Sequence, residues 1–222
     1  TEIYTLSLHY ALPILAYDAF SFFSTYLDAD NQPLFQGYDY LKNDTLMAQV
    51  AYWATFCGYK LRQPDETLRY HALALRDTAK REFTLQYVCE AYIQQANDSA
   101  LVATLTQGYD EYPEHPYFFP RLADYYTAKG QYDDVLKLTE QGLKTNADNQ
   151  LFLLAKSVAQ LNAGYYDDCL ETSELLIALN DTMPEAYFNI ATVHLNRAWE
   201  LEQENEPRKN HAKLIKLYQD AR

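Results

Sequence analysis

A motif that returns after 34 residues constrains this chain more than any other feature of its sequence. The segment 130–134, Gly-Gln-Tyr-Asp-Asp, recurs at 164–168 as Gly-Tyr-Tyr-Asp-Asp. Extending this offset in both directions gives frames that begin at positions 48, 82, 116 and 150, with a fifth beginning at Pro184. A period of this length is typical of arrays in which each repeat is a small unit that its neighbours cover.

Equivalent positions of the frames carry similar residues. The eighth position holds residues small enough for two helices to cross closely: Thr55, Cys89, Ala123, Ser157 and Ala191. Within each frame, apolar residues recur at three- and four-residue steps, which is the pattern of one helix face. In the frame from 116, Gly130 can adopt the left-handed backbone that ends a helix, and Asp133 can cap the next helix. These features predict an all-α chain of helical hairpins.

This period and its columns resemble the tetratricopeptide repeat (TPR) family. Besides the small eighth residues, the matches are a Tyr at the eleventh position, a Gly-x-Tyr turn and a closing Pro: Tyr92 and Tyr126, 130–132 and 164–166, and Pro113. The departures from the family pattern are Thr67, Leu101, Lys156, Leu176 and, where the first frame's turn Tyr would stand, Pro64. The resemblance implies a right-handed superhelical solenoid of helix-turn-helix repeats.

The frames also predict how the chain is divided. The expected parts are a non-native lead (1–14), a truncated repeat helix plus loop (15–47), four TPR repeats (48–81, 82–115, 116–149 and 150–183), and a degenerate, truncated closing hairpin (184–222). The lead resembles a translated sequencing-adapter read-through, and an ordinary helix or strand is the alternative. The finer expectations are a helix at 17–27, a loop at 28–43, a long helix at 185–203, a polar linker at 204–209 and a helix at 211–221.

Composition limits the kinds of partner. With 18 Lys and Arg against 31 Asp and Glu, the net charge is −13. Nucleic acids and anionic membrane surfaces would repel such a chain, and no apolar run approaches the roughly 20 residues that cross a bilayer. Cys57, Cys89 and Cys169 are odd in number and form no CxxC pair, so neither a disulfide framework nor a thiolate zinc site is expected. The compartment, cytoplasm or periplasm, stays open because the native N-terminus is expected to be missing.

No pattern in the sequence predicts catalysis, a metal or a cofactor. The five His lack the spacing of metal ligands on one helix, and no nucleophile elbow, Walker loop or dinucleotide fingerprint is present. His194 occupies a packing column and is interpreted as a satisfied structural residue. The Asp pairs 133–134 and 167–168 open second helices, where they are expected to offset the helix dipole and cap free N–H groups.

Four Asp-Ser/Thr-apolar triplets leave an alternative open. They stand at 44–46, 77–79, 98–100 and 181–183. They resemble an acceptor motif for O-glycans on exported bacterial proteins, and glycosylation would place the chain in the periplasm or on the cell surface. Ordinary turn and cap chemistry explains the same residues and is preferred.

The resemblance also implies a binding surface. In TPR proteins, the first helices line a concave groove, and fixed positions on them point inward. Mapped here, these positions give the predicted peptide-binding residues Tyr52, Phe56, Tyr59, Phe83, Gln86, Glu90, Tyr117, Asp124 and Leu154. The Lys and Asn of the family's carboxylate clamp are absent, so a chaperone C-terminal tail is not the expected ligand.

These observations favour a non-catalytic scaffold that binds a peptide or protein segment, in the manner of bacterial multi-TPR proteins. The alternative is a regulatory or sensor segment of a larger signalling protein or enzyme, and the sequence flanking the chain would separate the two. An enzyme within this chain would require a cleft that gathers polar residues from several repeats.

Overall fold

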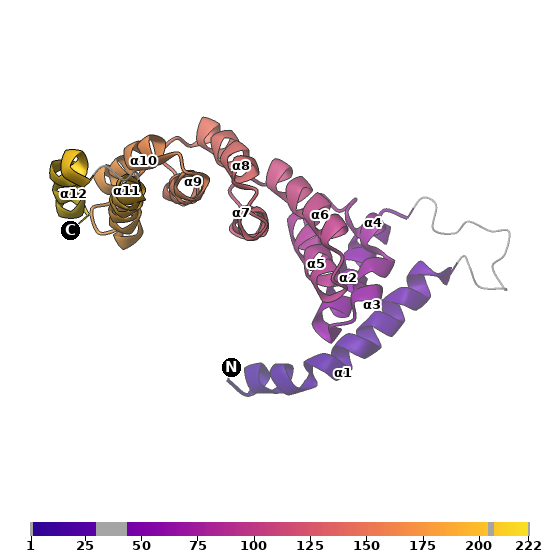
Figure 1. The fold of residues 1–222 in the computed structure, drawn as a ribbon. Helices are drawn as coiled ribbons and strands as arrows, with labels where there is room; N and C mark the ends of the chain where they lie inside the picture. The colour runs from indigo at the N-terminus through magenta and orange to yellow at the C-terminus, as the bar shows by residue number, and fades with distance from the viewer. Residues whose placement is uncertain (1, 30–43, 204–206, 222) are drawn as a thin grey trace. The chain divides into compact units, whose positions relative to one another are not determined.

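The structure is a computed structural model that describes residues 2–29, 44–203 and 207–221, with only the backbone described for 2–14 and 207–210. All regular elements within these residues are helices (Figure 1). The predicted all-α fold class is therefore confirmed. Most of the predicted loop at 28–43 and the first half of the predicted linker at 204–209 lie outside the described residues.

The chain divides into two compact units, Thr1–Phe119 and Pro120–Arg222, called here the N-terminal and C-terminal units. The helices of the N-terminal unit are α1 (Glu2–Leu27), α2 (Met47–Leu61), α3 (Pro64–Arg69), α4 (His71–Ala74), α5 (Arg81–Gln94) and α6 (Asp98–Glu111). The boundary falls within α7 (Phe118–Ala128). The C-terminal unit continues with α8 (Tyr132–Thr145), α9 (Gln150–Ala163), α10 (Tyr166–Leu179), α11 (Pro184–Gln203) and α12 (Pro207–Asp220).

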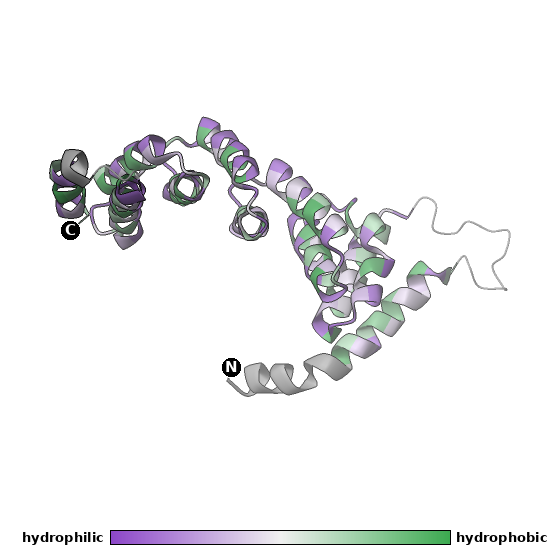
Figure 2. Ribbon diagram, in the orientation of Figure 1, coloured by the Kyte–Doolittle hydropathy of each residue, from purple (hydrophilic) through white to green (hydrophobic). Residues whose placement is uncertain are grey.

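The helices follow the 34-residue period. The frame 82–115 contains α5 and α6, and the frame 150–183 contains α9 and α10. Each helix carries both hydrophobic and hydrophilic residues (Figure 2), because one face packs on its neighbours and the other meets solvent. In the frame 48–81 the second helix is split into α3 and α4 at Tyr70. Pro64 opens α3, where its missing N–H removes no helical hydrogen bond.

Four of the five small residues in the eighth column are buried, and Ala191 is half-buried. Thr55, Cys89 and Ser157 of the eighth column are all 0% exposed. In the twenty-seventh column, Gly108 and Gly142 each face an aromatic ring of the next frame. A Cβ added at Gly108 would lie 2.3 Å from the Phe118 ring, and one added at Gly142 would lie 2.6 Å from the Phe152 ring. These glycines therefore allow successive hairpins to interlock.

Polar contacts act both within a hairpin and between neighbouring hairpins. Within the α5–α6 hairpin, the guanidinium of Arg81 donates to the Glu111 carboxylate at 2.8 Å. Between hairpins of the C-terminal unit, Arg197 of α11 donates to Asp167 of α10 at 2.7 Å, and Asn189 of α11 donates to the Ser157 hydroxyl of α9 at 2.9 Å. Their partners lie 30 to 32 residues away in sequence, close to one repeat. Repeat-to-repeat contacts thus combine apolar interlocking with hydrogen bonds.

The turn glycines behave as predicted, but the Asp caps do not. Gly130 and Gly164 have positive φ angles of 68° and 81°. The N-cap of α8 is Gln131, which makes no side-chain cap bond, so the prediction that Asp133 caps this helix was wrong. Asp133 lies two residues beyond the N-cap, and its carboxylate accepts from the Tyr165 hydroxyl at 3.3 Å instead. Its charge still lies in the first turn, where it offsets the dipole.

The first helix is longer than expected. A helix was predicted at 17–27, whereas α1 is continuous over 26 residues from Glu2. Phe20 and Leu27 belong to the same buried cluster as Ala51 and Tyr52 of α2, so α1 packs on α2 through its second half. Phe22 on the same helix remains 73% exposed.

The described residues hold no helix long and apolar enough to cross a membrane. All three cysteines are free and buried.

Each described Asp-Ser/Thr-apolar triplet lies in or beside a turn or helix start. In two of them the Asp side chain accepts from the backbone N–H two residues on: Asp44 from Leu46, and Asp77 from Ala79. These bonds are the turn chemistry that the sequence favoured.

Candidate protein-binding surfaces

The predicted site residues divide between the two units. Tyr52, Phe56, Tyr59, Phe83, Gln86, Glu90 and Tyr117 belong to the N-terminal unit, and Asp124 and Leu154 to the C-terminal unit. Each unit therefore offers its own candidate surface.

In the N-terminal unit, the rings of Tyr52, Phe56, Tyr59 and Tyr87 form what is called here the aromatic cluster. Tyr59 stacks on Tyr87 with centroids 4.6 Å apart, and Tyr52 stacks on Phe56 at 6.5 Å. The cluster joins α2 to α5, so neighbouring hairpins hold it. Two effects raise the pKa of the Tyr87 phenol: burial, which is the larger, and a hydrogen bond with Tyr52. The phenol therefore stays neutral.

The predicted residues differ in how much surface they offer. Tyr52 is 5% exposed and Tyr117 9%, so both support the surface more than they form it. Phe56 and Tyr59 are half-buried. Trp53, which the mapping did not select, is 41% exposed and meets the Tyr52 ring edge-on at 5.1 Å. The outer layer of this face is therefore Trp53 and Phe56.

Cations lie around the aromatic cluster. The ammonium of Lys60 stands 5.1 Å from the Phe56 ring centre and 5.3 Å from that of Tyr59. A cavity of about 610 Å³ beside them is lined by Tyr59, Lys60, Arg62, Glu90 and Gln94. One oxygen of the Glu90 carboxylate accepts a hydrogen bond from the Tyr117 hydroxyl at 2.8 Å. The remaining predicted residues of this unit, Phe83 and Gln86, are half-buried on α5.

The C-terminal unit contains a larger and more apolar groove between α9 and α11, with a volume of about 850 Å³. Leu154, Val158 and Leu161 of α9 contribute apolar surface, and Phe188 of α11 also lines the groove. The polar lining consists mainly of uncharged side chains: Asn162, Asn189, Thr192 and Asn196. Glu185 is the one carboxylate among the residues that line it. The groove suits a largely uncharged segment with apolar anchors.

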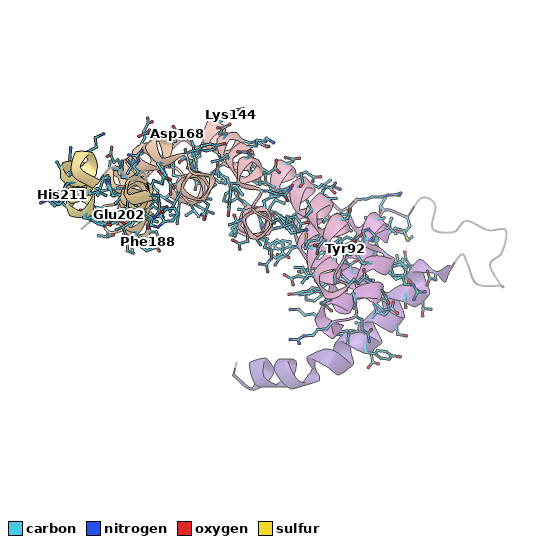
Figure 3. The ribbon with its side chains drawn as sticks, viewed as in Figure 1. Tyr92, Lys144, Asp168, Phe188, Glu202 and His211 are labelled. Atoms are coloured by element: carbon cyan, nitrogen blue, oxygen red, sulfur yellow. The ribbon has the colours of Figure 1, made fainter. Side chains whose placement is uncertain are left out.

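Phe188 is the most exposed large residue of this groove, at 68% (labelled in Figure 3). It begins a stripe along α11 that continues through Thr192, Leu195 and Trp199, at the spacing of one helix face. Leu195 is 47% and Trp199 63% exposed. An exposed apolar stripe of this kind is unusual on a helix that faces solvent, and it makes α11 a candidate interaction surface.

One buried hydrogen bond joins the two walls of the groove, and exposed polar contacts lie beside it. Asn189 is 3% exposed and its amide donates to Ser157 on α9, which ties the two walls together. The Asn162 amide donates to the Val158 carbonyl at 2.8 Å. Arg197 pairs with Asp167 and also lies 5.8 Å from the centre of the Tyr166 ring. The groove is thus preformed, which lowers the entropy cost of binding.

Comparison with known proteins bears on the fold. No protein-family model matches the chain, and no curated protein matches its sequence. A solved structure of MamA AMB-1 is similar, with a TM-score of 0.50 over 80% of this chain and 91% of that chain at 14% identity. A structure of MamA MSR-1 has a TM-score of 0.48 over 79% and 95%, also at 14% identity. MamA contains TPR repeats.

The present chain has a TPR-like fold. In this TPR-like array, Leu154 is the predicted residue that lines the α9–α11 groove, and Asp124 is exposed on α7. The sequence mapping missed Phe188 and Thr192, because it stopped where the period weakens at Pro184. Both occupy the columns of Leu154 and Val158, one frame later. Extending the mapping by one frame would have found them.

One prediction about a polar core residue was wrong. His194 was interpreted as satisfied, but its Nδ1 is buried without a hydrogen-bond partner. Within the described part of the chain, no three His, Cys, Asp or Glu side chains come together as a metal site.

Proposed function

We propose that this chain is a non-catalytic scaffold that binds a peptide or protein segment, with the α9–α11 groove as its principal site. The observation that carries the proposal is a preformed groove of about 850 Å³ over which Phe188 stands 68% exposed. The TPR-like fold supports protein binding as the function class. The uncharged amide side chains supply donors and acceptors for a peptide backbone, and the apolar wall takes its anchors.

Phe188 is expected to contribute most to affinity. Burying a Phe side chain contributes about 1.5–3 kcal/mol, which corresponds to roughly 10-fold or more in affinity. Hot spots are typically aromatic residues in well-packed, desolvated positions. Leu154 and Val158 provide the apolar contact surface beside it.

The test begins with selection of peptides from a displayed random library against the full chain. A selected peptide, labelled with fluorescein, is then titrated with the wild type and with two variants by fluorescence anisotropy. Phe188→Ala should weaken binding by roughly 10-fold or more. Phe22→Ala is the matched control, since Phe22 is 73% exposed on α1 of the other unit.

Equal affinity of the two variants for every selected peptide would move the site away from this groove. If no peptide bound saturably to the wild type, the proposal of a peptide-binding scaffold would be refuted. Circular dichroism of each variant controls for folding. Both substitutions replace exposed side chains, so the spectrum is expected to stay the same as that of the wild type.

A further inference from the structure

Four cations of the N-terminal unit have partners of two kinds. Arg69 and Arg81 are neutralised by carboxylates, Arg69 by Asp28 at 2.7 Å and Arg81 by Glu111. Lys60 and Lys80 instead lie over aromatic rings. The Lys80 ammonium is 6.0 Å from the Tyr52 ring centre and 5.7 Å from that of Phe83. The two lysines therefore flank the aromatic cluster.

The cavity beside the cluster has a positive balance. Its lining holds two cations, Lys60 and Arg62, and one carboxylate, Glu90. Since Glu90 accepts from the Tyr117 hydroxyl, part of its hydrogen-bonding capacity is already used. The local charge of this cavity is therefore opposite in sign to the net charge of the chain, which is −13. Salt screens the remaining charges beyond about 8 Å at physiological ionic strength, so the local balance decides what binds here.

We propose that this face of α2 and α5 binds a short acidic segment of a partner protein. Carboxylates of the segment would pair with Lys60 and Arg62, and an apolar or aromatic side chain would lie on Trp53 and Phe56. A cation over a ring keeps N–H donors available, so the cation–π contacts and the new ion pairs can coexist. This inference concerns a different unit from the α9–α11 groove and stands independently of it.

The chemistry favours an acidic peptide over a nucleic acid. A duplex carries a phosphate charge about every 1.7 Å and needs a continuous positive stripe. On this face the cations are Lys60, Arg62 and Lys80, which lie at the edges of one aromatic cluster. The chain as a whole is strongly acidic. A short peptide can present its carboxylates at these edges without approaching the acidic remainder.

The probe is a fluorescein-labelled peptide in which two glutamates on each side flank one phenylalanine. Anisotropy is measured with the full chain against this peptide, its all-glutamine counterpart and a labelled oligothymidylate. The glutamate peptide should bind saturably below millimolar concentration, more tightly than the glutamine peptide. Its affinity should fall as sodium chloride is raised.

Lys60→Gln/Arg62→Gln should weaken binding of the glutamate peptide by about fivefold, from the loss of two partly exposed ion pairs. Arg76→Gln is the control, because Arg76 is an exposed cation of the same unit that does not line the cavity. It should change the affinity little.

Absence of saturable binding, equal binding of the glutamine peptide, or equal losses in the cavity and control variants would overturn the inference. Tighter binding of the oligothymidylate would assign the face to nucleic acid instead. None of these outcomes affects the Phe188 test, so the two proposals can fail separately.

Discussion

Gly58→Ala gives the sharpest test of how the helices cross in this fold. Gly58 lies within α2, and a Cβ added there would lie 2.5 Å from the Thr67 backbone nitrogen and 2.8 Å from the Glu66 carbonyl carbon. Real Cβ atoms essentially never approach this closely. The obstacle is the backbone of α3, which cannot turn aside as a flexible side chain can.

Two effects of opposite sign determine the result. Ala is preferred to Gly inside a helix by about 1 kcal/mol, so without a clash the variant would be more stable. Overpacking a tight site costs about 1–3 kcal/mol, and a backbone obstacle places this site at the upper end. The expected net loss is about 2 kcal/mol, which lowers the melting temperature by roughly 6–10 °C for a unit of this size.

Thermal and urea unfolding followed by circular dichroism would measure this difference. The control is Ala103→Gly, an exchange of the same two residues at an exposed position of α6. It should lose about 1 kcal/mol through helix propensity alone. A Gly58→Ala variant that is more stable than the wild type would refute the close crossing of α2 and α3.

Three further predictions follow from single contacts. Arg81 lowers the pKa of Glu111 below its ordinary value of 4.5, so the pair stabilises the fold above about pH 5 and its contribution is lost as pH falls through the lowered pKa. Glu111→Gln should therefore cost about 0.5–1 kcal/mol at pH 7, and the difference from wild type in urea unfolding should shrink as pH falls through the lowered pKa. Burial raises the pKa of the Cys57 and Cys169 thiols, so iodoacetamide at about pH 8 should add no mass to the native protein and should label all three cysteines in urea; fast native labelling would contradict their burial. Ser157→Ala removes the acceptor of the buried Asn189 amide and should cost about 1–2 kcal/mol in urea unfolding, whereas unchanged stability would show that another acceptor replaces it.

The repeat pattern made the helical hairpins predictable, because packing restricts residue size at fixed intervals. Thr55, Cys89 and Ser157 could be identified as crossing positions from their size and spacing alone, and all three are buried. The left-handed turns at Gly130 and Gly164 were equally accessible, since few other residues adopt that backbone.

Local polar details could not be predicted in the same way. A two-residue difference in where α8 begins decides whether Asp133 is its N-cap, and the repeat pattern does not fix helix starts that finely. The split falls at Tyr70, which makes a tertiary contact: its hydroxyl donates to Asp28, 42 residues earlier in the chain. Such contacts leave no periodic signal.

The candidate surfaces were predicted in part. Leu154 was found because its column is regular, whereas Tyr52 is covered by the Tyr87 ring, 6.3 Å away, which the columns do not reveal. Phe188 was missed because α11, at 20 residues, is longer than the first helix of the family's repeat, so the 34-residue period weakens there. Whether a column residue is exposed depends on the ring sizes around it.

The central claim is that neighbouring hairpins stabilise one another. Phe152 of α9 is 3% exposed and fills the space that Gly142 leaves on α8, so Phe152→Ala should remove the contact between two hairpins without touching the backbone of α8. Hydrogen exchange measured by mass spectrometry should then show reduced protection of the α8 amides as well as those of α9 and α10. Protection lost in α9 and α10 with α8 unchanged would contradict the claim, because it would mean that the hairpin of α8 does not depend on its neighbour.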